Sequence, residues 1–306
     1  MHESLILERL PNRMIFMRPS MKLAPCVMLL LLLQTMAFST AAAAEGALHR
    51  IRNTQTIRLG YFEGSAPFSF TGSDKSPQGY SVALCQRVTE GIQRQLGLQR
   101  IRIVWVPLGL KDRIEAIRTG RIDIECGTTT WSFTRQKLVD FSLITFVDGA
   151  SLLVTDESNI KRLPDVEGKR IAVIRGTTTE RALAAALAKD KIKAEVIPID
   201  TRERGVTLLK EGGADAFASD RFLLFSLLRA TESPRPLRLI DEDFSVEPYA
   251  LALPRNDADF RLAVNRSLAD IYRSGEINRI YTRWLEQFGQ PSLLLSALYV
   301  LQSIPE

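Results

Sequence analysis

Strand and helix patterns alternate along this chain in two separate series, and that alternation restricts the possible fold more than any other feature. In the first series, apolar residues follow strand or helix spacing in turn over 57–61, 82–96, 101–106, 110–117 and 122–125. The second series restarts at 170–174 and continues over 181–189, 194–199, 206–210 and 214–218. Each series predicts an α/β unit with a mostly parallel sheet flanked by helices.

The C-terminal part of the chain is predicted to be helical. Apolar residues share one helical face over 260–271 and again over 277–288, with Gly275 between the two stretches. Two helices cannot form a third unit, so we expect them to pack on an existing one. The last apolar run, Leu293 to Leu301, is too short to cross a membrane, which takes ~20 residues. We expect it to pack against the body of the protein.

The N-terminus has the three parts of a secretory signal peptide. Basic residues precede an apolar run from Val27 to Phe38, and the small residues Ala41 to Ala44 follow it. We therefore expect residues 1–44 to be a signal peptide that is cleaved near Ala44, and the remaining chain to be exported to the periplasm. An N-terminal anchor that is never cleaved is the alternative.

Charge and composition exclude several classes of function. The formal net charge of +5 falls to +3 without residues 1–44, because four basic and two acidic residues lie there. With no block of Lys or Arg, nucleic acid is not an expected partner. Neither of the two histidines, His2 and His49, has metal-ligand spacing, so we expect no metal site and no cofactor. Cys85 and Cys126 are either a disulfide, which export permits, or two buried thiols.

A cluster of polar residues follows the strand at 122–125. Thr128, Thr129 and Thr130 are followed by Arg135. Hydroxyl groups, free backbone N–H groups and a guanidinium fork suit a carboxylate, because paired charge-assisted hydrogen bonds fix its orientation. The alternative interpretation is a capped turn with an exposed arginine.

Further candidates lie at the ends of other strands. Thr177 and Glu180 have the spacing of a capping box, and a helix N-terminus also attracts anions. Asp220 follows the strand at 214–218, where ligands collect in open α/β sheets, and its carboxylate would hold an ammonium group. Phe62 ends the first strand and would either stack over a small ligand or belong to the core.

Taken in order, several motifs resemble one known family. They are Gly79–Val82, Asp123–Thr130, Arg135–Lys137 with Asp140–Ser142, Arg175–Glu180, Ala216–Asp220 and Tyr272–Glu276. This set is similar to the bacterial solute-binding proteins of family 3, which bind polar amino acids for ABC importers. Within that family it is most similar to the glutamate/aspartate-binding subgroup.

The resemblance implies an α/β, type II periplasmic-binding fold with a ligand cleft between two lobes. Lobe 1 would comprise residues 45–148 and 249–306, and lobe 2 residues 149–248. The partners it implies are a free amino acid and an ABC permease in the inner membrane. We expect the protein to be a monomer.

Family positions for the amino-acid backbone are matched in this sequence. The arginine that binds the α-carboxylate in the family falls on Arg135, supported by Thr128 and Thr130. The aspartate that binds the α-ammonium group falls on Asp220. The resemblance therefore implies recognition of a free amino acid.

Positions for the ligand's side chain are matched only in part. Thr177 and Thr178 correspond to family positions at the distal end of the ligand, and Arg113 and Arg202 fall where binders of acidic ligands place polar or basic contacts. In contrast, Phe62 stands where glutamate/aspartate binders carry an arginine.

A second departure makes the expected pocket still more apolar, because Leu110 replaces a serine contact. Two other functions share the fold. An exported enzyme similar to cyclohexadienyl dehydratase would need a general acid or base, for which only Glu63 and Glu125 are available. A sensory module of a signalling protein is the third possibility. We predict a binding protein and not an enzyme.

The departure at Phe62 leads to a prediction about selectivity. Replacing Phe62 by Arg should shift preference toward glutamate over glutamine and toward aspartate over asparagine, because the new guanidinium can pair with a distal carboxylate. Titration of both proteins with these four amino acids measures the effect. Unchanged affinity ratios would place Phe62 outside the selectivity-determining contacts.

Overall fold

The computed structural model describes residues 46–230 and 236–304. The predicted signal peptide at 1–44 lies outside the described residues. Within those residues, no helix is both long and apolar enough to cross a membrane.

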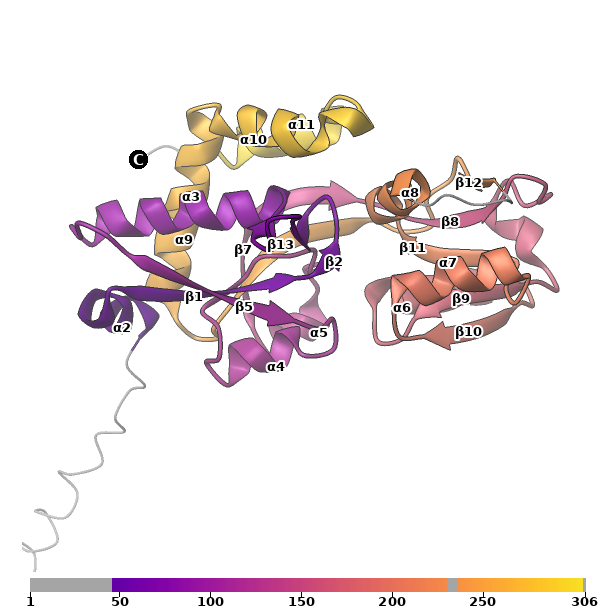
Figure 1. The fold of residues 1–306 in the computed structure, drawn as a ribbon, viewed down its shortest axis with the longest axis horizontal. Helices are drawn as coiled ribbons and strands as arrows, with labels where there is room; N and C mark the ends of the chain where they lie inside the picture. Colours follow the sequence, from indigo (N-terminus) through magenta and orange to yellow (C-terminus); the bar gives the residue numbers. More distant parts are fainter. Residues whose placement is uncertain (1–45, 231–235, 305–306) are drawn as a thin grey trace, which may run out of the picture. The chain divides into compact units, whose positions relative to one another are not determined.

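A first sheet of five strands carries one half of the fold (Figure 1). Its order is β5-β1-β6-β13-β7, and β13 is antiparallel to both of its neighbours while β1 is parallel to β5 and β6. The strands are β1 (Thr56–Phe62), β5 (Arg102–Leu108), β6 (Ile124–Glu125), β7 (Asp140–Asp148) and β13 (Glu247–Leu253). The sheet is mostly parallel, as predicted.

Helices cover both faces of the first sheet. The larger core lies on one face, where α2 (Ala47–Thr54), α3 (Tyr80–Gln95), α9 (Ala258–Arg273), α10 (Glu276–Leu285) and α11 (Leu293–Leu301) contribute buried residues. The other face packs against α4 (Arg113–Arg118). The one-turn helix α5 (Phe133–Gln136) comes shortly before β7, and the turn η3 (Glu286–Phe288) follows α10.

A small antiparallel sheet precedes α3. It consists of β2 (Gly64–Ser65), β3 (Ser69–Thr71) and β4 (Pro77–Gln78). Gly79 joins it to α3 with a φ of 124°, and a Cβ there would lie 2.3 Å from the carbonyl oxygen of Phe68. Only glycine fits this link, because its backbone conformation is open only to glycine and the space is already filled.

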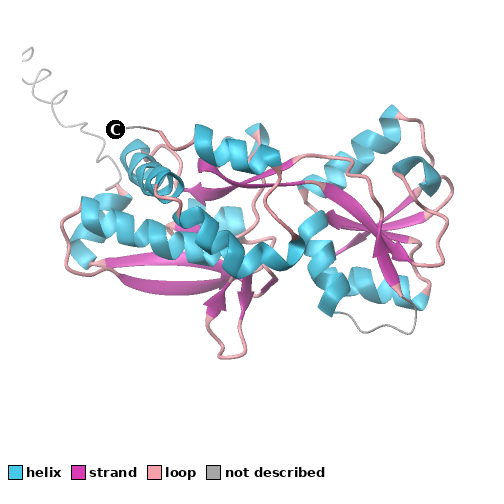
Figure 2. Cartoon of the chain, turned by 90° about the horizontal axis from the view of Figure 1, so that it is seen from above, coloured by secondary structure: helices cyan, strands magenta, loops and turns pink. Residues whose placement is uncertain are grey.

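A second sheet of five strands, with helices on both sides, forms the other half of the fold (Figure 2). Its order is β10-β9-β11-β8-β12; the first three strands are parallel, and β8 is antiparallel to β11 and β12. The strands are β8 (Ala150–Thr155), β9 (Arg170–Ile174), β10 (Glu195–Ile199), β11 (Ala216–Asp220) and β12 (Leu237–Leu239).

Two apolar cores hold the helices of this half on opposite faces of the sheet. One contains buried residues of α6 (Thr178–Lys189) and of the turn η2 (Leu163–Val166). The other contains those of α7 (Arg202–Glu211) and α8 (Arg221–Ala230). Every helix and strand predicted from the two series is present, but several boundaries differ.

Where the observed boundaries differ from the predicted ones, polar residues that were expected in loops lie within strands or helices. The strand predicted at 214–218 runs to Asp220, so this carboxylate ends the strand instead of following it. The helix predicted at 206–210 begins at Arg202, because the hydroxyl of Thr201 caps it by accepting a hydrogen bond from the amide of Arg204. The helix predicted at 181–189 begins at Thr178 with Thr177 as its N-cap.

The chain passes between the two sheets at two places. It leaves the first sheet at Asp148 and enters the second at Ala150, with only Gly149 between β7 and β8. It returns at Glu247, where β13 begins. We propose that these two passages are the boundaries of the two lobes expected from the sequence.

The C-terminal helix α11 packs on the first half, as predicted. The hydroxyl groups of Tyr299 and Tyr80 lie 2.7 Å apart, and Tyr299 also donates to the carbonyl oxygen of Thr145. Leu295, on the same helix, is buried in the same core cluster as the two tyrosines.

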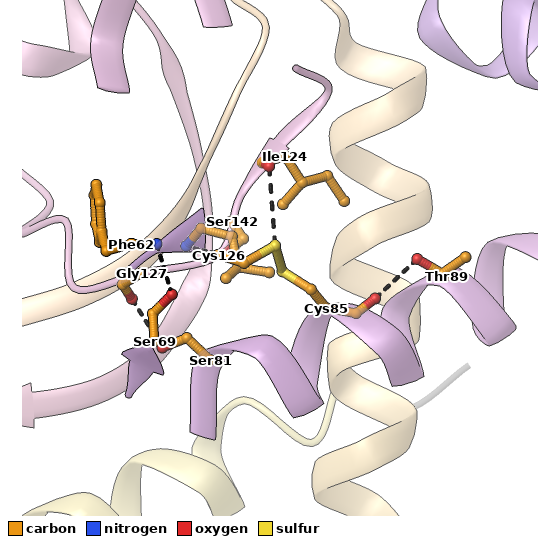
Figure 3. The surroundings of a disulfide bond; sticks show 10 residues. Phe62, Ser69, Ser81, Cys85, Thr89, Ile124, Cys126, Gly127 and Ser142 are labelled. Carbon is orange, nitrogen blue, oxygen red and sulfur yellow. Dashed lines mark hydrogen bonds between the residues drawn. A yellow bond between two sulfur atoms is a disulfide. The ribbon is translucent and has the colours of Figure 1, made fainter. Parts of the chain in front are cut away.

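Cys85 and Cys126 form a disulfide, which decides between the two alternatives left by the sequence (Figure 3). The bond joins α3 to the segment that follows β6. On the same segment, the carbonyl oxygen of Gly127 accepts a hydrogen bond from the hydroxyl of Ser81 in α3 at 2.8 Å. These two links hold the chain immediately before Thr128 against a long helix.

Removal of the disulfide should lower stability. The two cysteines are 41 residues apart, and closing a loop of that length is worth about 2–4 kcal/mol. We expect the Cys85→Ala/Cys126→Ala protein to lose this amount of unfolding free energy in denaturant titrations. The parent protein under reducing conditions should match it. Equal stability of oxidised parent and double variant would show that the bond adds no net stability.

Candidate ligand-binding site

One pocket collects every site residue predicted from the sequence. Its lining comes from segments at the carboxyl ends of strands in both sheets, where open α/β folds place their ligands. From the first half it contains Phe62, Leu110, Arg113, Thr128, Thr130 and Arg135. From the second half it contains Ile174, Thr177, Thr178, Thr179, Arg202, Ala218, Ser219 and Asp220.

Arg135 lies on the one-turn helix α5. Ser132 caps this helix by accepting a hydrogen bond from the amide of Arg135. The guanidinium is buried, and its Nη1 donates to the carbonyl oxygen of Thr130 at 2.8 Å. Burial, and then repulsion from Arg113, lowers the pKa of Arg135 to about 10. It remains charged at neutral pH and makes no ion pair with any residue that the structure describes.

Thr130 joins the two halves at the pocket. Its hydroxyl lies 3.0 Å from the hydroxyl of Thr178 and donates to Glu247 Oε2 at 2.7 Å. Thr178 is the first residue of α6, so the contact crosses from one sheet to the other.

Thr177 has a different role from Thr178. Its hydroxyl accepts from the amide of Glu180 and donates to the carbonyl oxygen of Ile174. Glu180 in turn accepts from the amide of Gly176. Thr177 therefore caps α6 while lining the pocket, as the capping interpretation expected.

Asp220 is buried and held on both oxygens. Oδ1 accepts from the hydroxyl of Thr179 at 2.8 Å, and Oδ2 accepts from the hydroxyl of Tyr249 at 2.5 Å. The Tyr249 hydroxyl also lies 3.2 Å from Asp148 Oδ2. Burial, and then the charge of Asp220, raises the pKa of Asp148 well above its usual range. The surroundings of Asp148 therefore disfavour its charged form.

Two more guanidinium groups are buried in the pocket. Arg113 Nη1 donates to the carbonyl oxygen of Leu110 at 2.5 Å, and Arg202 Nη1 donates to the hydroxyl of Ser65 at 3.1 Å. The Nε atoms of both are buried and have no hydrogen-bond partner among the described residues. Burial lowers the pKa of each, and for Arg113 the nearby Glu125 opposes the shift.

Phe62 forms an apolar wall of the pocket. Its side chain is buried in a core cluster, and Leu110 packs against the same cluster. A Cβ at Gly127 would lie 2.2 Å from the Phe62 ring. The ring therefore occupies the space that glycine leaves open.

Charge is strongly unbalanced among the lining residues. Three guanidinium groups face one carboxylate, that of Asp220. Burial of like charges without enough counter-charge is costly. The pocket is therefore complementary to an anion that also carries a cationic group.

Sequence reasoning missed two groups that shape the site. Thr179 binds Asp220, and Tyr249 joins Asp220 to Asp148. The run of threonines was a visible signal for the first. Nothing in the sequence indicated the second, because Tyr249 reaches the site from a strand of the other sheet.

Comparison with known proteins identifies the class. Residues 57–287 match the bacterial extracellular solute-binding proteins, family 3. The chain belongs to this family, as the motifs predicted.

The curated relatives and solved structures agree with that assignment. The L-glutamate/L-aspartate-binding protein of Pseudomonas aeruginosa is 33% identical over 87% of this chain and 89% of its own. The glutamate/aspartate import solute-binding protein of Salmonella typhimurium is 29% identical, over 80% and 82% of the two chains. An ancestral arginine-binding protein bound to glutamine superposes with a TM-score of 0.66 at 25% identity, covering 76% of this chain and 98% of that one.

A further solved structure bears on the fold alone. It is an ancestral amino acid-binding protein described as a precursor of cyclohexadienyl dehydratase, with a TM-score of 0.67 at 24% identity over 79% of this chain and all 100% of that one. The type II periplasmic-binding fold is thereby confirmed.

The position of Asp220 in the pocket predicts that removal of its negative charge strongly lowers the affinity for the ligand. Asp220→Asn should weaken binding of an ammonium-bearing ligand by roughly 30- to several-thousand-fold, the effect of breaking a buried charge pair. Asp148→Asn is the matched control, since it changes a buried carboxyl group that contacts the same tyrosine but does not line the pocket, and it should weaken binding far less than Asp220→Asn. Titration calorimetry measures both. Equal losses in the two variants would mean that Asp220 acts only through the hydrogen-bond network.

Proposed function

We propose that this protein is the periplasmic substrate-binding component of an ABC importer and that it captures a free acidic amino acid. The observation that carries the proposal is the charge of the pocket, where three buried arginines face a single carboxylate. An acidic amino acid has two carboxylates and one ammonium group. Its net negative charge complements the lining.

Each group of such a ligand has a partner of the right chemistry. Arg135 would bind the α-carboxylate, with the hydroxyl groups of Thr128 and Thr130 beside it. Asp220 would bind the α-ammonium group. The two hydrogen bonds that it accepts from hydroxyl groups fix the orientation of its carboxyl group.

The distal carboxylate would lie between Arg113 and Arg202. Their orphan Nε atoms are donors that the described residues do not satisfy, and a buried donor without a partner favours a ligand that supplies one. Thr177 and Thr178 would border this end from the second half. Phe62 closes the pocket with an apolar wall, so in this proposal Arg113 and Arg202 supply the positive charge that its position does not.

Binding would close the two halves around the ligand. Hinge closure of this kind is established for periplasmic binding proteins. The contacts of Thr130 with Thr178 and of Arg202 with Ser65 already link the halves at the pocket. The passages at Gly149 and before Glu247 would act as the hinges.

The site favours binding over catalysis. Of the two carboxylates suggested as general acid or base, Glu63 is exposed and Glu125 is buried, and neither lines the pocket. Asp220, which does line it, already accepts two hydrogen bonds. The protein would therefore release its ligand unchanged, to an inner-membrane permease. Residues 1–44 would direct export to the periplasm, and the exported protein would act as a monomer.

Calorimetric titration against the twenty amino acids tests the proposal directly. We expect glutamate or aspartate to bind most tightly. Arg135→Ala should lose roughly 30- to several-thousand-fold in affinity, because the α-carboxylate would lose its charged partner in a desolvated site.

Arg118→Ala provides a control of equal charge, since Arg118 is exposed on α4 and pairs with Glu115. It should bind like the parent. If Arg135→Ala bound the preferred amino acid within threefold of the parent, the assignment of Arg135 would be wrong. A parent protein that bound no amino acid would overturn the function itself.

A further inference from the structure

A buried carboxyl group that does not line the pocket lies close behind it. Glu125 ends the short strand β6, and its side chain is 1% exposed. Neither carboxyl oxygen has a hydrogen-bond partner within residues 46–230 and 236–304. Buried carboxyl groups are nearly always hydrogen-bonded. A buried carboxyl group without such a bond, close to the pocket, therefore requires a functional explanation.

The surroundings of Glu125 connect it to the pocket. The space beside it is closed by Gly127, where a Cβ would lie 2.3 Å from Glu125 Oε1 and 2.2 Å from the Phe62 ring. The charged groups that act on it most are Arg113, from α4, and Arg135, from α5. The hydroxyl of Thr129, on the same segment, is close enough to lower the pKa of Glu125 as a donor would, but the two groups do not meet the geometry of a hydrogen bond. No ion pair within 4.0 Å joins Glu125 to either arginine in the described chain.

We propose that Glu125 is a positioning residue for ligand selectivity: its carboxyl group, acting through Arg113, takes up a proton when an acidic amino acid enters the pocket. This inference rests on the proposed function, because it requires a ligand with a distal carboxylate.

Two carboxylates compete for the positive charge of Arg113: that of Glu125 and the distal carboxylate of the ligand. While Glu125 is ionised, it offsets part of the positive charge that Arg113 presents to the pocket. A bound distal carboxylate adds a negative charge near Glu125, and like charges in a low-dielectric site favour the protonated form of one of them. Protonation of Glu125 then leaves the full charge of Arg113 to the ligand. A neutral amide side chain has no such effect.

The titration range of Glu125 makes this exchange accessible near neutral pH. Burial raises its pKa to about 7, against the opposing effect of Arg113. Below that pH, Glu125 is already neutral and binding needs no proton. Above it, binding of an acidic ligand must take up a proton, so affinity falls as pH rises. Selectivity for the acid over the amide should therefore be highest on the acidic side.

Other titratable groups near the pocket are Asp148, Asp220, Glu247 and Tyr249. Burial raises the pKa values of Asp148 and Tyr249 well above their usual ranges. Asp220 and Glu247 accept hydrogen bonds from hydroxyl groups. Asp148→Asn is a matched control, since it removes a second buried carboxyl group that, unlike Glu125, accepts hydrogen bonds and does not have Arg113 among the main charges acting on it.

The test compares the pH dependence of binding in the parent, Glu125→Gln and Asp148→Asn. Dissociation constants for L-glutamate, L-aspartate, L-glutamine and L-asparagine are measured between about pH 6 and about pH 8.5. We expect the parent's affinity for the preferred acidic member to fall roughly tenfold across this range, which corresponds to a shift of about one pKa unit in Glu125. Affinity for the amides should change by less than about twofold.

Glu125→Gln mimics the protonated carboxyl and should bind the acid with the low-pH affinity throughout. Asp148→Asn should keep the parent's slope. A parent profile that is flat, or an identical slope in Glu125→Gln, would overturn the role of Glu125. Loss of all binding in a folded Glu125→Gln protein would do the same.

A measurement on the parent alone covers the case in which Glu125→Gln fails to fold. Calorimetric titration near pH 7.5 in two buffers of different ionisation enthalpy gives the number of protons taken up. We expect net uptake with L-glutamate or L-aspartate and none with the matching amide; equal values for acid and amide would refute the inference. If the parent binds none of these amino acids at any pH, the proposed function fails instead.

Discussion

Three guanidinium groups are buried in one pocket with a single lining carboxylate, and the arrangement of the whole site follows from holding them there. Each is tied to the protein through an uncharged oxygen: Arg113 and Arg135 to backbone carbonyls, and Arg202 to the hydroxyl of Ser65. Such bonds orient a guanidinium without neutralising it. The excess positive charge therefore remains available to the acidic ligand proposed above, and burial strengthens its effect.

The scaffold has to resist the repulsion that this excess creates. Parallel strands end at one edge of each sheet, which brings their following turns to a common place. The disulfide between Cys85 and Cys126 and the hydrogen bond from Ser81 to Gly127 tie the turn before Thr128 to α3. On the other side, the caps at Thr177 and Thr201 fix where α6 and α7 begin. Rigid segments on both sides let the polar groups converge with defined orientations.

Tyr249 connects two buried carboxyl groups. Asp220 accepts hydrogen bonds from the hydroxyl groups of Thr179 and Tyr249, whereas burial raises the pKa of Asp148, beyond the same tyrosine, well above its usual range. Asp148 ends β7 at the passage between the sheets, and Tyr249 belongs to the returning strand β13. The group proposed to bind the ammonium is therefore connected by hydrogen bonds to both passages. A conformational change at the pocket would therefore alter the same hydrogen bonds as a conformational change at the passages between the sheets.

The sequence by itself determined the two α/β units, the elements of the two alternating series, the family and nine of the residues that line the pocket, because periodicity, strand ends and motif spacing are local properties. It misjudged boundaries such as the start of α7 at Arg202, where one capping hydroxyl decides the first turn. Only the tertiary structure decided that Cys85 and Cys126 are bonded, that Tyr249 joins two aspartates, and that Glu125 is buried near the charge of Arg113 with no hydrogen-bond partner among the described residues. Those facts depend on register between strands and on desolvation, and both arise only when segments distant in the chain come together.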